Sequence, residues 1–425
     1  MGIMLAISFI VLLVLGIPIA IVLGVSSLVS IYYGSMIPLA IIPQRMFTAT
    51  DSFPLLAIPL FMLAGALMEN GGISKRLISL ANTLVGSFTG GFAMAAILTC
   101  MFFAAISGSG PATVAAIGGI MIPAMVAKGY DKGFAAALLA VSGAIGIIIP
   151  PSIPMVTYGV MSGVSIGNLF TAGFGPGILI GLCLMITTYF LSKKNGWGGE
   201  KIPFSIIEVI KALKESIWAL LMPVIILGGI YGGIFTPTEA AGVAVIYGLL
   251  VGIFIYRELK INIIPKVLVT SARTTAMIML IISTAQVFGW IMTSERIPDA
   301  VARSILGVSD NRFIILLMIN LMLLLVGCFM ETNAALIILT PIFLPLVVSL
   351  GIDPLFFGII MIANLAVGMA TPPLGVNLYV AAGIEGISLE RISKAAVPLL
   401  ISNVVALLLL TFIEPITTFL PNLLK

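Results

Sequence analysis

The sequence predicts an all-α protein that crosses a membrane many times and is built as an inverted repeat. Its 425 residues are 60% hydrophobic and only 8% charged, against about 25% charged in soluble proteins. Many apolar stretches reach the length of about 20 residues that a membrane-spanning helix needs, and they lack the alternation of a transmembrane barrel. One segment also occurs twice, half a chain apart, and ends each time in two prolines.

The repeated segment covers residues 122–154 and 344–376. The two copies agree at Pro123 and Pro345, Asp131 and Asp353, Phe134 and Phe356, Gly146 and Gly368, and at the pairs Pro150–Pro151 and Pro372–Pro373. Proline breaks a helix and frees carbonyl groups. In lipid, such groups persist only where they face protein or a water-filled cavity. Two helices broken at matching places are typical of secondary transporters, whose binding site lies at the breaks.

The order of the elements follows from the apolar runs. Uninterrupted runs predict membrane-spanning helices near 4–33, 54–70, 168–192, 216–235, 239–256, 272–292 and 395–418. Longer runs near 133–163 and 354–384 contain the double prolines and predict broken helices. Two others, 91–126 and 312–350, are interrupted by small polar residues and predict re-entrant hairpins. Shorter amphipathic stretches ahead of each hairpin, 73–88 and 297–308, predict helices along the membrane surface.

This order predicts two bodies that alternate along the chain. A transport domain would consist of residues 91–163 and 312–384, each half with one hairpin and one broken helix. A scaffold would consist of residues 1–90, 164–311 and 385–425. Its middle part contains a cytoplasmic linker, 193–215, and the second surface arm.

The positive charges predict the orientation. If both interrupted runs are hairpins, all but five of the 20 lysines and arginines fall on one side; the five are Arg45, Arg296, Arg303, Arg312 and Lys425. The positive-inside rule places the richer side in the cytoplasm. The N-terminus and the first hairpin are then expected inside and the second hairpin outside, so that the two halves are inverted.

Four segments hold nearly all the polar groups at membrane depth: the hairpin tips 106–113 and 327–334 and the broken helices 142–152 and 364–377. Unwound carbonyls with Ser, Thr and Asn oxygens can coordinate sodium without fixed charge. The N-terminal ends of the half-helices offer free N–H groups to an anion. The pattern therefore predicts cation and anion sites side by side, as symport requires.

Single residues in these segments also have structural explanations. Small residues let membrane helices pack closely, although their symmetric placement favours a function. Glu331 is a carboxylate at membrane depth, which is costly and usually functional; the alternative is a side chain that reaches the outer interface or pairs with an arginine. We expect Asp131, Asp353 and Glu239 to begin helices, where the helix dipole favours an acid.

Composition excludes several other functions. Histidine is absent, which removes the usual proton shuttle. Cys100, Cys183 and Cys328 lie far apart in apolar runs, without metal or redox spacing. The dispersed net charge of +4 does not imply nucleic acid. The apolar N-terminus is expected to be a retained span and not a signal peptide.

At the same residues the chain resembles the large membrane subunit of the tripartite ATP-independent periplasmic (TRAP) transporters. The motifs span almost the whole chain: SGSGPATVAAIG (107–118), GIIIPPSIP (146–154), SIGNLFTAGFGPG (165–177), FTPTEAAGVA (235–244), GIDPLFFGII (351–360) and MATPPLGVN (369–377). The resemblance implies an elevator-type, sodium-coupled importer of an organic acid in the bacterial inner membrane. Sialic acid or a C4-dicarboxylate is the implied substrate. The implied partners are a small four-helix membrane subunit and a periplasmic binding protein, with no cofactor beyond sodium as the coupling ion.

The resemblance also implies site residues, because the family's hairpin tips and broken helices form its sodium and substrate sites. For sodium these are Ser107, Gly108, Ser109, Gly143, Gly146, Gly327, Thr332, Asn333, Asn364, Gly368 and Thr371. For the substrate they are Ser109, Pro150, Pro151, Ser152, Thr332, Asn333, Pro372 and Asn377. The family's first tip usually has two serines before Pro-Ala-Thr. Here Gly110 replaces the second, so a backbone carbonyl must serve there.

Two alternatives remain open from the sequence. A stand-alone sodium-coupled carboxylate transporter would use the same hairpins without a binding protein, and it would need no separate small subunit. An intramembrane enzyme would need a catalytic base or a metal cluster near the membrane edge. The absence of histidine, of a cysteine cluster and of an acidic pair within a span disfavours the enzyme. A passive channel would not need duplicated broken helices.

Overall fold

The computed structural model describes residues 1–34, 37–197, 203–309 and 311–423, so that Lys425 and residues 198–202 of the predicted linker lie outside the described part. These residues form helices and no strands, which confirms the all-α prediction. Nine of the described helices are long and apolar enough to cross a membrane. The chain is therefore a multi-pass membrane protein.

The helices follow the predicted order. The first half contains α1 (Gly2–Val14), α2 (Ile19–Gly34), α3 (Ile41–Thr50), α4 (Ala57–Asn70), α5 (Ile73–Val85), α6 (Gly91–Ser107), α7 (Gly110–Ala127), α8 (Lys132–Gly143), α9 (Ile153–Ser162) and α10 (Ile166–Asn195). The second contains α11 (Ile206–Tyr231), α12 (Pro237–Leu250), α13 (Ile264–Ser294), α14 (Ile297–Leu306), α15 (Arg312–Phe329), α16 (Thr332–Ser349), α17 (Pro354–Gly368), α18 (Val376–Glu385), α19 (Leu389–Phe412) and α20 (Pro415–Leu423). Short 3-10 turns are η1 (Phe53–Leu56), η2 (Ala144–Ile147) and η4 (Ile261–Ile263), and Val251–Ile255 (η3) is π-helical.

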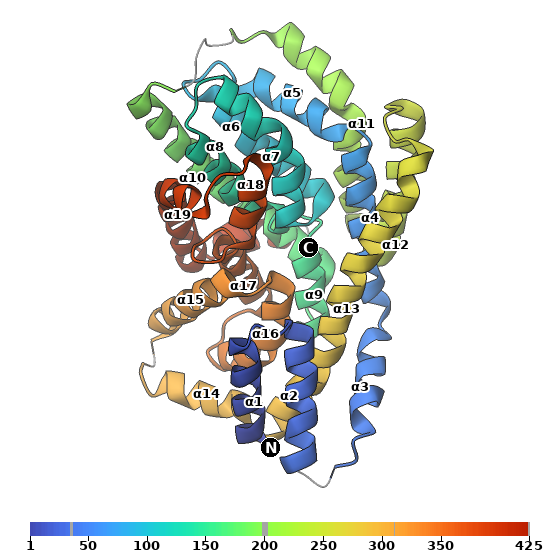
Figure 1. Cartoon of the computed structure of the whole chain (residues 1–425), viewed down its shortest axis with the longest axis vertical. Helices are drawn as coiled ribbons and strands as arrows, with labels where there is room; N and C mark the ends of the chain where they lie inside the picture. The colour runs from blue at the N-terminus through green and yellow to red at the C-terminus, as the bar shows by residue number, and fades with distance from the viewer. Residues whose placement is uncertain (35–36, 198–202, 310, 424–425) are drawn as a thin grey trace.

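Both halves contain the predicted hairpin and broken helix. The hairpins are α6–α7 and α15–α16, which approach the middle of the molecule from opposite ends (Figure 1). Helix α8 continues through η2 to the first pair of prolines before α9 begins, and α17 is separated from α18 by the second pair. The peptide bond between the two prolines is cis in both pairs, Pro150–Pro151 and Pro372–Pro373. The predicted surface arms are α5 and α14.

Acidic and hydroxyl side chains begin the helices as expected. Asp131 accepts a hydrogen bond from Phe134 N at 2.9 Å, and Asp353 accepts one from Leu355 N at 2.8 Å. Glu239 closes a capping box at the start of α12. Partial burial raises the pKa of Asp131, but hydrogen bonds from Arg391 and from backbone N–H groups outweigh it and hold the pKa below its ordinary value.

The N-terminal run differs from the prediction of one span near 4–33. The chain turns at Gly16, which has φ +73°, and Pro18 follows, so α1 and α2 form a short hairpin. The amino group of Met1 lies 3.4 Å from Glu295, directly before the second arm. The N-terminus therefore lies at the second-hairpin end (Figure 1), and its expected place beside the first hairpin is wrong. The charge distribution is unaffected, because the first lysine or arginine is Arg45.

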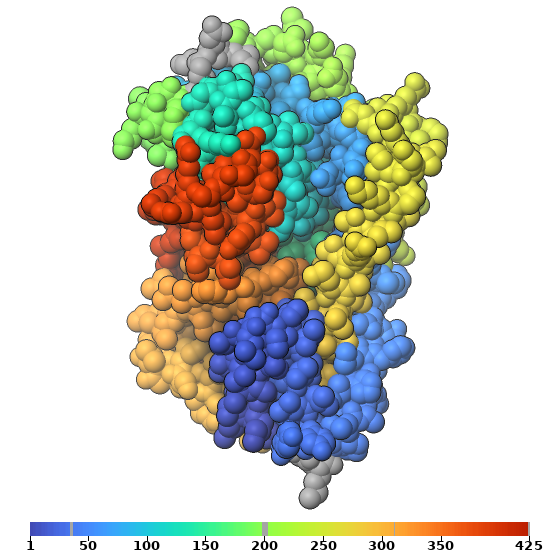
Figure 2. All heavy atoms as spheres, in the orientation of Figure 1, coloured from blue at the N-terminus to red at the C-terminus, as the bar shows by residue number. Residues whose placement is uncertain are grey.

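Packing groups the helices into two bodies. One comprises α6–α9 and α15–α18, with α19 packed along α8, and with α10 packed along α6, α17, α19 and α20. In the other, α4, α11, α12 and α13 pack together, and α2 and α3 lie on α13. Figure 2 shows the yellow α12–α13 column beside the blue N-terminal helices, apart from the red C-terminal helices. The predicted scaffold included residues 164–311 and 385–425; the packing instead groups α10, α19 and α20 with the hairpins. Composition cannot reveal this, because apolar helices of either body look alike.

Candidate functional site between the hairpin tips

The first tip is closed by its own side chains. Ser107 Oγ lies 2.9 Å from Thr113 Oγ1, and Thr113 Oγ1 donates to Ser109 O at 2.8 Å. Gly108 makes the turn with φ +60°, and a Cβ there would lie 2.8 Å from Pro151 O. The tip therefore rests directly on the break of its own half.

The second tip is built around Glu331, the N-cap of α16. Its carboxylate accepts from Ala334 N at 3.1 Å and from Asn333 Nδ2 at 2.8 Å. Asn333 Oδ1 in turn accepts from Thr157 on α9 at 2.9 Å. Thr332 Oγ1 lies 2.8 Å from the sulfur of Met369. The second tip is thus bonded to the broken helix of the other half.

Glycines allow the tips to approach the breaks. A Cβ on Gly146 would lie 2.5 Å from Thr113 Oγ1, and a Cβ on Gly368 would lie 2.6 Å from Gly327 Cα. At these distances an added side chain would force the tip or the break to shift. A Cβ on Gly146 would also lie 2.7 Å from Ser109 O, so each tip is in backbone contact with a broken helix. The predicted residues Gly143, Gly146, Gly327 and Gly368 are therefore brought together with the tips.

Three buried oxygens near the breaks have no hydrogen-bond partner among the described residues: Ser142 Oγ, Asn364 Oδ1 and Asn377 Oδ1. All three residues are fully buried. Ser142 and Asn364 occupy equivalent positions in the two halves. A buried polar group without a partner is destabilising, and a small cation would satisfy it. Neutral hydroxyl and amide oxygens suit a hard cation better than a transition metal. No cluster of three His, Cys, Asp or Glu exists in the described part of the chain.

A cavity of about 440 Å³ lies between the two tips. One wall is formed by the tips, through Gly108–Pro111, Glu331 and Asn333. The opposite wall is formed by α4 and α13, through Met62, Thr274, Met277, Ile278 and Ile281. Helices α7, α9 and α16 begin at this cavity, and helix N-termini attract anions. Glu331 is the one ionisable side chain among the described residues of its wall.

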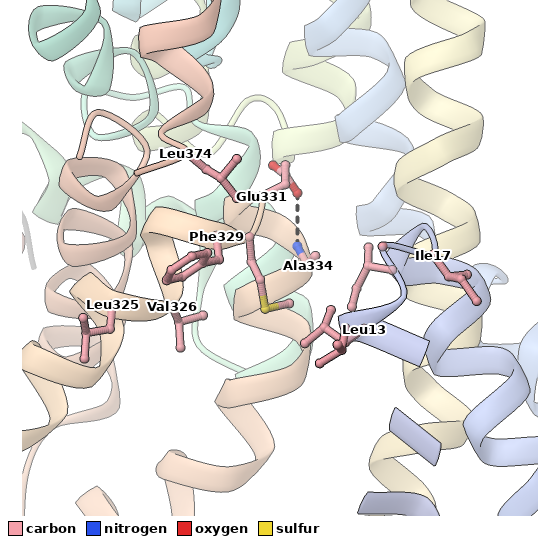
Figure 3. A pocket seen from close by; sticks show the side chains of 12 residues that line it. Leu13, Ile17, Leu325, Val326, Phe329, Glu331, Ala334 and Leu374 are labelled. Carbon is pink, nitrogen blue, oxygen red and sulfur yellow. Dashed lines mark hydrogen bonds between the residues drawn. The ribbon is translucent and has the colours of Figure 1, made fainter. Parts of the chain in front are cut away.

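Further cavities continue from this one. A cavity of about 290 Å³ is lined by Ser107, Ser109, Glu69 and Ser271, and the next, of about 320 Å³, by Glu69, Lys75 and Glu258. They lead toward the first-hairpin end. On the other side of Glu331, a mostly apolar cavity of about 640 Å³ separates the second tip from the α1–α2 turn. Figure 3 shows Leu13 on one side of it and Phe329 on the other.

The predicted substrate residues do not all reach the cavity. Ser109 and Asn333 line it, as does the predicted sodium residue Gly108. The Ser152 hydroxyl does not line it but donates a hydrogen bond to Ile147 O at 2.6 Å. Thr371, which is predicted for sodium, likewise donates to Val367 O at 2.8 Å. Of the remainder, Pro372 is partly exposed, and the others lie buried behind the walls: Pro150, Pro151, Thr332 and Asn377.

Sequence reasoning missed the scaffold side of the site. Thr270, Ser271 and Thr274 on α13 and Glu69 on α4 line the cavities beside the first tip. A signal was present, because Thr270 and Thr274 are four residues apart and therefore share one face of an otherwise apolar helix. The repeated motifs indicate only the tips and the breaks. Helices α4 and α13 contain no break, so the repeat did not indicate them.

Comparisons with known proteins agree on one family. The family model "Tripartite ATP-independent periplasmic transporter, DctM component" matches residues 6–416. The chain is 51% identical to the isethionate TRAP transporter permease protein DctMQ of Oleidesulfovibrio alaskensis, over 96% of this chain and 64% of that protein, so it spans about two thirds of that relative's length. It is 43% identical to the C4-dicarboxylate TRAP transporter large permease protein DctM of Pseudomonas aeruginosa, over 94% of this chain and 93% of that one.

Two further similarities concern another substrate and the fold. The chain is 40% identical to the sialic acid TRAP transporter large permease protein SiaM of Vibrio cholerae, over 89% of each chain. The crystal structure of the Alcanivorax borkumensis YdaH transporter superposes with a TM-score of 0.64 at 14% identity, covering 89% of this chain and 90% of that one. At that identity the likeness concerns the fold alone.

Proposed function

Because the chain belongs to the DctM family of tripartite ATP-independent periplasmic transporters, we propose that it imports an organic acid anion together with sodium. As a TRAP large permease it is a multi-pass protein of the bacterial inner membrane and not an enzyme. The observation that carries sodium coupling is the set of buried oxygens without partners at the two breaks, Ser142, Asn364 and Asn377.

The arrangement explains how a cation and an anion would be bound together. The unpartnered oxygens lie behind the tips, whereas the N-termini of α7, α9 and α16 face the cavity between them. An anion in that cavity would be stabilised by the N-termini of α7 and α9 and by sodium bound behind them, whereas Glu331 already caps α16. Sodium entry would supply the drive, about 2.3 kcal/mol per charge at 100 mV from the membrane potential.

The movement we propose is that of an elevator. The body of α6–α10 and α15–α20 would slide past α4 and α11–α13, and the cavity lies where the two bodies meet. The cavities leading to the first-hairpin end would be the inward route. Binding must favour the fully loaded carrier, because a half-loaded one would leak sodium.

The relatives named for isethionate, C4-dicarboxylates and sialic acid supply the candidate substrates. All three are organic acids, which suits the N-termini of α7 and α9 at the cavity. The N-terminus of α16 is already capped by the Glu331 carboxylate. We propose that a periplasmic binding protein delivers the substrate and that a small four-helix membrane subunit completes the permease. A stand-alone carboxylate transporter is the second candidate.

Sodium-driven uptake into proteoliposomes tests these proposals. The chain is reconstituted with its small subunit, and each candidate acid is offered with and without the cognate binding protein. We expect uptake under a sodium gradient, and little under a proton gradient alone. Full activity in sodium-free buffer would exclude sodium coupling. Equal uptake of free substrate without binding protein or small subunit would favour the stand-alone transporter.

A further inference from the structure

We propose that the cavity between the first hairpin tip and helices α4 and α13 is a transient sodium site on the inward route, and that the carboxylate of Glu69 is its charged ligand. The inference rests on the sodium coupling and the elevator movement proposed above. It adds to them a site on the body of α4 and α11–α13, which would receive sodium from the first tip and would not move with it.

The position of this cavity makes it a passage. Its volume is about 290 Å³, and the first tip lines one side of it while α4 and α13 line the other. Four of its residues also line the central cavity between the two tips: Met62, Ser109, Pro111 and Thr274. Glu69 is shared with the next cavity, of about 320 Å³, toward the first-hairpin end. Sodium that leaves the first tip in this direction would therefore pass Glu69.

The polar groups of the cavity suit a cation and not an anion. Glu69 is the one ionisable side chain among its described lining residues, and none of those residues is a lysine or an arginine. The hydroxyls of Thr270 and Thr274 donate to Lys266 O at 2.9 Å and to Thr270 O at 3.2 Å. A carbonyl can only accept, so each hydroxyl gives its hydrogen to the backbone and keeps lone pairs for another group. A carboxylate and hydroxyl oxygens are ligands that a hard cation prefers.

The carboxylate of Glu69 is available to such a cation. Within the part of the chain that the structure describes, it takes part in none of the ion pairs. Arg76 on α5 is already paired with Glu258, at 2.7 Å. Lys75 lines the next cavity together with Glu69 but is not within ion-pair distance of it. In that same cavity Ser74 Oγ is buried without a partner among the described residues, so polar oxygens continue along the route.

The fixed place of Glu69 would confine its effect to one side of the membrane. Helix α4 packs in one body, whereas the first tip belongs to the other and would move with it. In the position that the structure shows, the tip faces Glu69 across the cavity. A carboxylate that lines an enclosed route raises the local concentration of cations and disfavours anions. Glu69 would therefore hold sodium and repel the substrate in the inward position, and it would have no influence once the tip has moved outward.

The test measures sodium dependence separately on the two sides of the membrane. The chain and its small subunit are reconstituted in proteoliposomes, and the binding protein is added outside only, so that uptake reports carriers whose periplasmic face points outward. Internal sodium is varied against choline at constant ionic strength, because it occupies the inward-facing carrier and inhibits uptake. Glu69→Gln should need roughly tenfold more internal sodium for half-inhibition. The external sodium concentration for half-maximal uptake should stay the same.

Three further variants identify the cause. Glu69→Asp keeps the charge and should respond to internal sodium nearly as the wild type does. Thr270→Val keeps the shape of the side chain and removes a ligand oxygen, so it should shift the internal dependence in the same direction by a smaller factor. It also tests the site if Glu69→Gln does not fold. Glu215 is exposed on α11 and does not line these cavities, so Glu215→Gln is the matched control and should change neither side.

A substitution of Lys75 distinguishes a sodium ligand from an ion pair. If Glu69 served only to attract Lys75 from the neighbouring cavity, Lys75→Gln and Glu69→Gln would have the same effect. We expect Lys75→Gln not to raise the internal sodium concentration for half-inhibition, because it removes a positive charge from the route.

Each outcome decides the proposal. Unchanged internal sodium dependence in Glu69→Gln would overturn it, as would an equal shift in the external dependence, or an equal internal shift in Lys75→Gln or Glu215→Gln. A wild type whose uptake does not depend on external sodium would refute the sodium coupling itself, and the site with it. The two failures are therefore distinguishable.

Discussion

The two hairpin tips have the same backbone plan but present different chemistry. The first is neutral, is closed by Ser107 and Thr113, and rests on the break of its own half. The second contains Glu331 and reaches Thr157 in the other half through Asn333. The helices of the two halves break at matching places, whereas the side chains at the two tips differ. The halves are thus equivalent in architecture and separable in function, which mutations at matched positions can test.

The largest effect is expected at the double prolines. Replacing Pro150 and Pro151 by Ala should let α8 and α9 join and use up carbonyls that a ligand needs. We expect sodium-driven uptake to fall roughly tenfold or more, with the protein still present in the membrane. The matching change at Pro372 and Pro373 should reduce uptake equally. The first pair is buried and the second partly exposed, so only the first should also lower the thermal unfolding midpoint.

Uptake is measured in proteoliposomes and normalised to the reconstituted protein. Wild-type uptake in either double variant would mean that its break is structural alone. A large loss in one half only would show that the two breaks differ in function as the two tips do.

Glycine substitutions at the contacts between tip and break should have the next largest effect. Gly146→Ala would bring a methyl group 2.5 Å from Thr113 Oγ1, and Gly368→Ala would bring one 2.6 Å from Gly327 Cα. Such overpacking costs about 1–3 kcal/mol, and here it would displace each tip from the cation site that we propose for it. We expect the sodium concentration for half-maximal uptake to rise in both variants.

Each half offers a matched control glycine. Gly119 on α7 and Gly383 on α18 have nothing within 4 Å of an added Cβ. Gly119→Ala and Gly383→Ala should therefore leave sodium dependence unchanged. Similar losses in test and control variants would place the effect in the helices themselves and not at the contacts.

The tips can then be compared through their hydroxyls. Ser109→Ala and Thr332→Ala should each weaken apparent sodium affinity by about 1–2 kcal/mol, the scale of one polar contact in a membrane interior. Ser109 also lines the cavity, whereas Thr332 is buried against Met369. Ser109→Ala should therefore also raise the substrate concentration needed at saturating sodium, and Thr332→Ala should not. Titrations of both ligands check this, and unchanged sodium dependence in both would move the sites away from the tips.

Much of the fold could be predicted because its signals are local. Proline pairs, interrupted apolar runs and helix-capping acids such as Asp131 and Asp353 act on their own neighbours in sequence. The N-terminal hairpin was missed because Gly16 and Pro18 break a run that hydropathy alone reads as continuous. The placement of α10 and α19 was missed because it depends on packing between distant apolar helices.

The site was predictable only where the repeat marks it. The repeat drew attention to the tips and breaks, and the structure brings Ser109 and Asn333 to one cavity. It could not reveal that Asn377 reaches across to Ala140, since the two residues lie in different halves. Nor could it reveal the wall formed by Thr274 and Met62, whose helices carry no break.

The smallest effect concerns the two surface arms, which differ in the residue before each helix. Gly72 precedes α5 with φ +83°, and Arg296 precedes α14 with φ +54°. The left-handed region costs a residue with a side chain roughly 1–2 kcal/mol, whereas glycine adopts it without that cost. Glycine also has more conformational entropy in the unfolded chain, which offsets about half of the gain in stability. Arg296→Gly should therefore stabilise the protein by about 1 kcal/mol or less. The thermal unfolding midpoint measures this, with Arg296→Ala as the control that removes the charge but keeps the strain. A gain with alanine equal to that with glycine would assign the effect to the charge, and the arms would then not differ in backbone strain.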